Sequence, residues 1–231
     1  LWLVYFVLSL ACLLAYRWAG MSWSDAFMHA CTTMGLGGFS SHDLSFGYWN
    51  SPLIEAVAVV FMMLAGINFG LYFVAWRDRS FWVLWRDVEV RAFYAVIVAT
   101  VALISLYLAA HQVYPTFGES LRHTVFHVVS IATTTGYAAY DYAQWPIFAP
   151  LLMILLGCFA TCAGSTGGGI KMVRMVLLIK QSNREMVRIV HPNVVNPVVF
   201  GASPVSPRVM QSVIAFMMAY GATLVGLTML L

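Results

Sequence analysis

The sequence predicts an all-α integral membrane protein built from a repeated helix–short helix–loop–helix unit. The chain is 61% hydrophobic and 9% charged, with a mean hydropathy of +0.83, whereas charged residues make up about 25% of a typical soluble domain. Apolar runs long enough to cross a bilayer, about 20 residues each, recur along the chain. Shifting the sequence by 98 residues also places His29 on His127, Asp43 on Asp141 and Pro52 on Pro150 without a gap. Such register predicts a duplicated unit.

The first unit is predicted over residues 1–76. Its spanning helix, short helix, loop and second span are expected over 1–18, 22–33, 34–50 and 52–76. Ser22 or Ser24 can cap the short helix, which is too short to span. Pro52 suits the first turn of the second span. The chain starts at Leu1 inside an apolar run, so we expect an internal piece of a longer polypeptide.

The second unit is predicted over residues 92–190. Its elements are expected as a span, a short helix, a loop and a broken span, over 92–112, 119–132, 133–142 and 145–190, with the break at 164–169. Three further segments complete the chain: a surface segment, a linker with four prolines and the first helix of another unit, over 77–91, 191–207 and 208–231.

The orientation follows from the basic residues. Ten of the twelve Lys and Arg residues fall within 77–91 and 171–208, which leaves Arg17 and Arg122. The positive-inside rule makes the side of the ten residues cytoplasmic. The opposite side is then rich in acidic residues, and a negative mouth raises the local concentration of cations.

The two loops carry the functional prediction. Each contains a key glycine, Gly38 or Gly136, after a short helix and between two spans. Glycine permits backbone angles that let several carbonyls face one axis, and the negative end of the short helix favours a cation there. Backbone held at membrane depth must be satisfied by protein, water or ion. We therefore expect two loops of an ion filter, although external turns would also accommodate these glycines.

Three motifs carry a family resemblance: Thr33–Ser40, Thr133–Tyr137 and Gly164–Lys171. Together they resemble the Trk/Ktr/HKT potassium-transporter superfamily, over essentially the whole chain. The resemblance implies a bacterial inner-membrane, multi-pass protein in which four such units surround one pore. This chain would supply the second and third filter loops and the first helix of the fourth unit.

The resemblance also implies roles for individual residues. The K⁺ filter would comprise residues on both loops, namely Leu36, Gly37, Gly38, Thr134, Thr135 and Gly136. Filter support would come from Phe39, Tyr137, Asp43 and Asp141. The implied partners are a second copy in a homodimer, a cytosolic nucleotide-binding regulatory subunit of the TrkA type, and the lipid bilayer. The basic segments 77–91 and 171–191 are where we expect the regulator, although orientation alone also explains their charge.

The glycine-rich run offers a second site, which the resemblance makes a gating loop. Its members are Gly164, Ser165, Thr166, Gly167, Gly168, Gly169 and Lys171. The run nearly fits a phosphate-binding loop, but the lysine comes one position late and no strand is expected before it. A packing kink is the simpler alternative. Lys171 would place a positive charge near the inner pore.

Other polar residues have structural alternatives. His123 and His127 are four apart, as metal ligands on a helix can be, but hydrogen bonding within the short helix is the favoured role. Asp43 and Asp141 can attract cations or brace their loops, and we hold both interpretations. Asn68 can face the pore or another helix. The cysteines have no metal or disulfide spacing.

Potassium transport is the function these features favour. It requires no covalent chemistry, so we expect no enzyme activity, no cofactor besides the transported K⁺ (or Rb⁺ or Na⁺) and no nucleic-acid partner. Two alternatives remain: a coupled secondary transporter of a small solute at the broken span, and a membrane-embedded metal-dependent enzyme using the histidines and aspartates.

Overall fold

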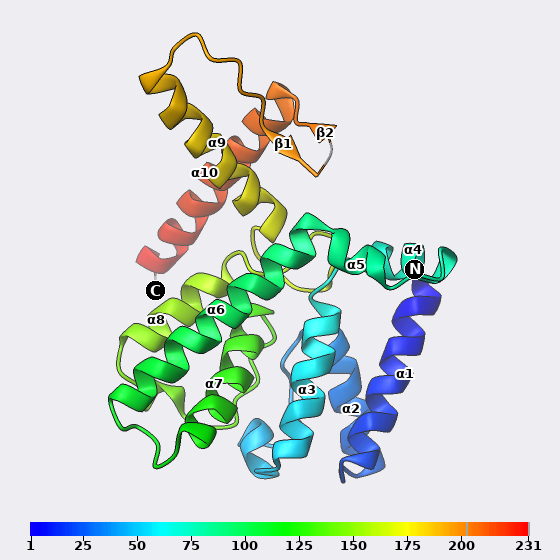
Figure 1. The fold of residues 1–231 in the computed structure, drawn as a ribbon. Coiled ribbons are helices and arrows are strands. Elements are labelled where there is room, and N and C mark those ends of the chain that lie inside the picture. The colour runs from blue at the N-terminus through cyan, green and yellow to red at the C-terminus, as the bar shows by residue number, and fades with distance from the viewer. Residues whose placement is uncertain (202, 231) are drawn as a thin grey trace.

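The computed structural model describes residues 1–201 and 203–230, and this part of the chain is mainly helical (Figure 1). The elements in order are α1 (Trp2–Trp18), α2 (Trp23–Met34), the 3-10 helix η1 (Ser45–Tyr48), α3 (Pro52–Ala65), α4 (Phe69–Arg77), α5 (Trp82–Arg86), α6 (Val88–Ala110), α7 (Phe117–Ala132), η2 (Tyr142–Gln144), α8 (Phe148–Gly157), α9 (Met172–Val190), β1 (Val199–Phe200), β2 (Ser203–Pro204) and α10 (Pro207–Leu230).

Two groups of helices lie side by side and share one core. Helices α1, α2 and α3 form the first group, and α6, α7 and α8 form the second (Figure 1). Helix α7 contacts α3, so the short helix of the second group joins the two. Tyr16, Met34, Phe46, Phe126 and Tyr137 are at most 1% exposed in this core. Burial of large side chains from both groups therefore holds the two loops in place.

The short helices begin where their caps predict. Ser22 accepts a hydrogen bond from the Asp25 N–H and caps α2, as expected for a serine at this position. Thr116 caps α7 through the Glu119 N–H, so α7 begins at Phe117, two residues before the predicted start.

The predicted span over 52–76 is divided into α3 and α4, which are bent by 84°. Asn68 ends the break because its Oδ1 accepts the Gly70 N–H at 2.8 Å and caps α4. The ring of Phe93 packs so closely on Gly66 that a Cβ there would lie 2.9 Å from it. Helix α4 therefore lies at one end of the first group, next to α1 and α5 (Figure 1).

The second unit breaks earlier than predicted. Helix α8 ends at Gly157, and α9 begins only at Met172, so the break extends well beyond 164–169. The chain doubles back here, because the Ile170 N–H bonds to the Cys158 carbonyl at 2.7 Å. Gly169, with φ +83°, permits this close approach; a Cβ would lie 2.5 Å from the same carbonyl oxygen.

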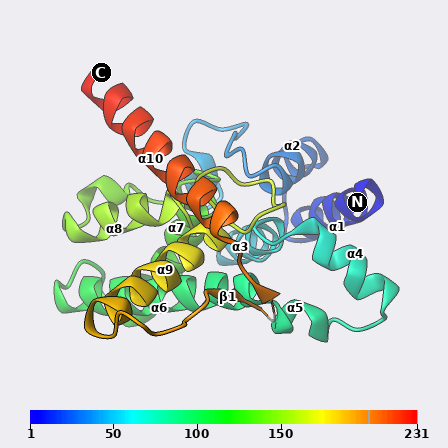
Figure 2. The same ribbon diagram turned by 90° about the horizontal axis from the view of Figure 1, so that it is seen from above.

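Two helices in the described part of the chain, α6 and α10, are long and apolar enough to cross a membrane, and the bent α3–α4 pair would be a third. Helix α6 begins at Val88, because Asp87 caps it, rather than at the predicted Ala92. Helices α9 and α10 pack on each other through Leu177, Met210 and Val213 (Figure 2). The predicted linker 191–207 contains the β1–β2 hairpin. Residues 202 and 231 of these predicted segments lie outside the description.

Candidate functional site

The first loop (residues 35–40) and the second loop (residues 133–138) have matching backbone conformations. Leu36 has φ +50° and Gly38 has φ +70°; their equivalents 98 residues later, Thr134 and Gly136, have φ +61° and +89°. In each loop the intervening residue is not in this left-handed region. Alternation of this kind turns successive N–H groups to one side of the backbone. The carbonyls then face the other side.

The N–H groups of both loops point back into the short helices. In the first loop Leu36 and Gly37 donate to carbonyls of α2, at 3.2 and 2.8 Å. In the second loop Thr134 and Thr135 donate to carbonyls of α7, at 2.9 and 2.8 Å. Each acceptor in α7 is again 98 residues beyond its counterpart in α2. The repeat is therefore preserved at the level of individual hydrogen bonds.

The carbonyls of the predicted filter residues are free to bind something else. Within residues 1–201 and 203–230, none of them accepts a hydrogen bond; they belong to Leu36, Gly37, Gly38, Thr134, Thr135 and Gly136. A carbonyl at membrane depth needs a partner from water or an ion. Dehydrated cations are bound by such groups of backbone oxygens.

The two loops touch at Gly38. A Cβ on this residue would lie 1.9 Å from the Thr135 carbonyl oxygen, so no side chain fits there. Gly136 differs, because its surroundings are open within 4 Å and only its φ of +89° favours glycine. The same motif glycine is thus required for close approach in one loop and for backbone conformation in the other.

Tyr137 ties the second loop to the first short helix. Its hydroxyl bonds to the hydroxyls of Thr32 and Thr33, the latter at 3.1 Å, and Thr33 also bonds to Tyr16 at 2.8 Å. Tyr137 is 1% exposed, whereas its counterpart Phe39 is 77% exposed. Of the two predicted aromatic supports, Tyr137 is therefore a buried brace within this chain and Phe39 is not.

Two hydroxyl residues also hold the loops, and sequence reasoning missed them. Thr32 donates to the Phe39 carbonyl at 3.0 Å, and Ser130 donates to the Tyr137 carbonyl at 2.8 Å. Both residues lie in the last turns of their short helices and are 98 residues apart. Because the two hydroxyl residues occupy equivalent positions in the repeat, the sequence could have predicted that they share a role.

The two repeated histidines are hydrogen-bonded within their own units. His29 bonds to the Asp25 carbonyl and to Ser40, and His127 bonds to the carbonyls of His123 and Tyr140, all at 2.8 to 3.0 Å. No group of three His, Cys, Asp or Glu residues able to hold a metal occurs among the described residues. The favoured structural role of these histidines agrees with these contacts.

The two repeated aspartates lie at a shared hollow. Asp43 and Asp141 both line it, together with Leu44, Gly47 and Ala138. Asp141 also braces its own turn, accepting the Ala143 N–H at 3.1 Å. Both aspartates are thus placed to attract cations, but bracing is seen for Asp141 and not for Asp43 among the described residues.

A third acid lies near the first loop. Hydrogen bonds from Ser22 and Ser41 lower the pKa of Asp25, at the start of α2. This carboxylate therefore adds a negative charge at the same side of the molecule at neutral pH.

The glycine-rich loop (residues 164–171) contacts the second candidate filter loop and the end of α2 just before the first. Thr166 donates through Oγ1 to the Met34 carbonyl, next to the first loop, at 2.9 Å. The Gly168 N–H donates to Oγ1 of Thr134, in the second loop, at 2.8 Å. A single irregular segment therefore binds both the second loop and the residue that precedes the first loop.

Lys171 closes the glycine-rich loop on itself. Its Nζ donates to the Gly167 carbonyl and lies 3.5 Å from Oγ of Ser165 and 3.4 Å from Oγ1 of Thr161. Its backbone has φ +76°, which is unusual for a residue other than glycine. The charge that was predicted near the inner pore is thus held within this loop.

An ion pair joins the two units near the starts of α3 and α7. Arg122 of α7 donates from Nε and Nη2 to the two carboxylate oxygens of Glu55 in α3, at 2.8 and 2.6 Å. It also reaches Oδ1 of Asn50 at 3.2 Å. Glu55 is 3% exposed, and a bidentate pair is the geometry that compensates a buried carboxylate best.

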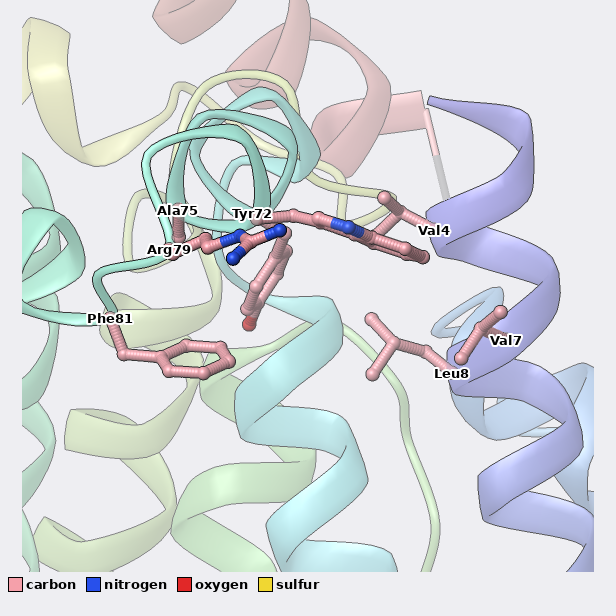
Figure 3. A pocket seen from close by; sticks show the side chains of 8 residues that line it. Val4, Val7, Leu8, Tyr72, Ala75, Arg79 and Phe81 are labelled. Carbon is pink, nitrogen blue, oxygen red and sulfur yellow. The ribbon is translucent and has the colours of Figure 1, made fainter.

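A separate apolar groove lies between α1 and α4 (Figure 3). It is lined by Val4, Val7, Leu8, Tyr72, Ala75, Trp76, Arg79 and Phe81. None of the residues predicted for the filter or the gate is among them, so this groove is not part of the candidate ion pathway.

Comparison with known proteins agrees with this architecture. The family model described as TrkH, cation transport protein, matches residues 1–229. The chain belongs to the TrkH family. It is 42% identical over 220 residues to the Trk system potassium uptake protein TrkH of Salmonella typhimurium and to that of Escherichia coli K12, covering 95% of this chain and 46% of each relative.

A solved TrkH structure shows the same fold. The crystal structure of the potassium transporter TrkH from Vibrio parahaemolyticus matches with a TM-score of 0.94 and 38% identity, over 97% of this chain and 48% of that one. The predicted superfamily and the fold of repeated pore-helix units are confirmed. The chain spans about half the length of the curated relatives it matches.

Proposed function

We propose that this TrkH-family chain forms part of a potassium-conducting pore. The observation that carries the proposal is the pair of touching loops whose left-handed residues recur in register and whose carbonyls have no partner in the described structure. The relatives are named as potassium uptake proteins. The carbonyls of Leu36, Gly37, Thr134 and Thr135 would replace part of the hydration shell of K⁺.

The surroundings of the loops suit the passage of a cation. Helices α2 and α7 end at the loops, so the negative ends of their dipoles face the proposed site. Asp43 and Asp141 would attract cations to the hollow at the mouth. An ion leaving the filter would then meet the glycine-rich loop, which we propose as the gate, with Lys171 opposing cations while it is closed.

The distribution of charge gives the proposed orientation. The ten basic residues of the predicted inner face lie on or around α4, α5 and α9, at the end of the molecule opposite the short-helix starts. We place this end in the cytoplasm and the chain in a bacterial inner membrane as a multi-pass protein. The units would be 1–76 and 92–190, with 77–91 and 191–207 on the cytoplasmic side and 208–231 opening a further unit.

Several components would complete the transporter. Two filter loops surround only part of an ion, so further loops must come from the rest of the polypeptide. We propose a homodimer and a cytosolic TrkA-like nucleotide-binding subunit, which would contact the basic segments 77–91 and 171–191. No covalent chemistry or cofactor enters this function, and the lipid bilayer is its solvent.

Ion uptake tests the proposal. The complete parent polypeptide, reconstituted in proteoliposomes, should take up Rb⁺ well above Na⁺, and Gly136→Ser should abolish that preference. Gly20→Ser is a matched control, because Gly20 also has a positive φ and open surroundings but lies in the turn after α1. Equal preference in wild type and Gly136→Ser, or no Rb⁺ uptake by wild type, would contradict the filter assignment.

A further inference from the structure

One buried carboxylate binds the backbone on both sides of the glycine-rich loop. We call these two sides the entering base (residues 161–164) and the leaving base (residues 172–173). Oε1 of Glu89 accepts the Ala163 N–H at 2.7 Å and the Val173 N–H at 3.0 Å. Glu89 belongs to α6, far away in sequence, and is only 7% exposed. One oxygen atom therefore links the chain entering the loop to the chain leaving it.

Glu89 is placed for this role by the start of α6. A buried carboxylate is costly unless hydrogen bonds compensate it, and charge-assisted bonds to backbone N–H groups are among the stronger ones. The first turn of a helix also favours a negative charge. Asp87 already caps α6 by accepting the Val90 N–H at 3.0 Å. The two acids thus have separate tasks: Asp87 stabilises its own helix, and Glu89 binds the loop.

The entering base has a second attachment, to the break between α3 and α4. The Cys162 N–H donates to the Gly66 carbonyl at 3.0 Å, and the Phe69 N–H donates to the Gly164 carbonyl at 3.1 Å. No comparable bond from that break reaches Val173 in the described structure. The two bases are also bonded to each other, because the Met172 N–H donates to the Thr161 carbonyl at 2.8 Å. Glu89 is the side chain that ties both of them to α6.

We propose that Glu89 is the positioning residue that keeps the glycine-rich loop across the ion pathway. With both bases fixed, movement is confined to the residues between them, which contact the end of α2 and the second loop through Thr166 and Gly168. Loss of the bonds to Glu89 detaches both bases from α6 and so weakens the anchoring that keeps the loop in the pathway. This inference rests on the proposed function of the loop as a gate.

Three variants of the complete polypeptide test the inference by Rb⁺ flux in proteoliposomes without the regulatory subunit. Glu89→Ala should raise this flux by about fivefold or more, the usual lower range of coupling between sites, and leave the Rb⁺/Na⁺ preference unchanged. Glu89→Gln retains an oxygen acceptor and should stay close to wild type. Asp87→Ala is the matched control, because it removes a carboxylate from the same turn without touching the loop.

A second measurement does not depend on transport. Cys162 is fully buried beside the entering base, so its modification by a water-soluble thiol reagent reports release of the loop. In a background with the other cysteines replaced by serine, Glu89→Ala should accelerate this modification and Glu89→Gln should not. If Glu89→Ala does not accumulate in membranes, Glu89→Leu retains the volume without an acceptor and should give the same result.

The outcomes separate the two proposals. Unchanged flux and unchanged Cys162 modification in folded Glu89→Ala would overturn the role of Glu89, as would an equal response of Asp87→Ala. Absence of Rb⁺ flux from wild type would instead remove the proposed function, while Cys162 modification would still show whether Glu89 holds the loop.

Discussion

The two units agree closely up to the end of their loops and diverge after the following helix. In the first unit the chain turns by 84° over residues 66–68 and resumes as α4. In the second unit it forms an irregular segment over 158–171 that contacts the second loop and the end of α2. A duplicated unit has thus kept the part that presents carbonyls and changed the part below it. Under the proposed function, the repeated loops would bind the ion and the single irregular segment would act as the gate.

The largest difference between the two halves is expected at their key glycines. Gly38→Ala should prevent the loops from meeting, because its Cβ would lie 1.9 Å from the Thr135 carbonyl oxygen and its φ is positive. Gly136→Ala should cost only about 1–2 kcal/mol of backbone strain, since its surroundings are open. Thermal unfolding of the detergent-purified protein should show a large loss of stability for the first and a small one for the second. Similar losses would contradict the asymmetry of the loops.

An intermediate effect is expected where the units are joined. Arg122→Ala leaves the Glu55 carboxylate, 3% exposed, without its bidentate partner, and should lower the free energy of unfolding by about 1–3 kcal/mol. Glu55→Gln should remove part of the same interaction. In a double-mutant cycle the two losses should be strongly non-additive. Additive losses would mean that the pair does not connect α3 to α7.

The smallest effect is expected at the aspartates of the mouth. Asp43→Asn and Asp141→Asn should each lower Rb⁺ uptake by less than about threefold at low ionic strength, and the effect should fade in salt as the charges are screened. Asp141→Asn should also reduce thermal stability slightly, because its carboxylate braces the Ala143 N–H. Asp43 has no such bond among the described residues, so its variant should be as stable as wild type. A salt-independent loss in both would favour bracing over attraction of cations.

The sequence predicted local structure correctly where the same feature occurred in both repeats. Register between the units predicted both short helices, the glycines at left-handed positions and the structural histidines, because each prediction had a counterpart 98 residues away. The break in the second unit had no counterpart. Hydropathy continues through residues 158–163, so the early end of the helix depends on long-range hydrogen bonds, such as those from Ile170 to Cys158 and from Cys162 to Gly66. The role of Glu89 could not be predicted either, because its hydrogen-bond partners are backbone N–H groups distant in sequence.

The same limitation applies to the bend after α3. Gly66 and Asn68 were visible, but the direction of the bend depends on the Phe93 ring and on the capping bond within α4. Composition describes how apolar a segment is, but it does not say which side chain from another helix packs against the end of that segment. The prediction of one continuous span over 52–76 was therefore wrong, and the 84° turn could not be predicted from composition.

The Tyr137 brace has a consequence for folding during synthesis. The hydroxyl that anchors Thr32 and Thr33 of α2 belongs to a residue more than 100 positions later in the chain. The first short helix is therefore synthesised before its anchor, and the ribosome must complete α7 and the second loop before the two can join. Contacts of such long range are formed late, and the incomplete chain exposes surfaces on which it can misassemble. Newly made α2 is thus a segment that insertion factors have reason to protect until the second loop arrives.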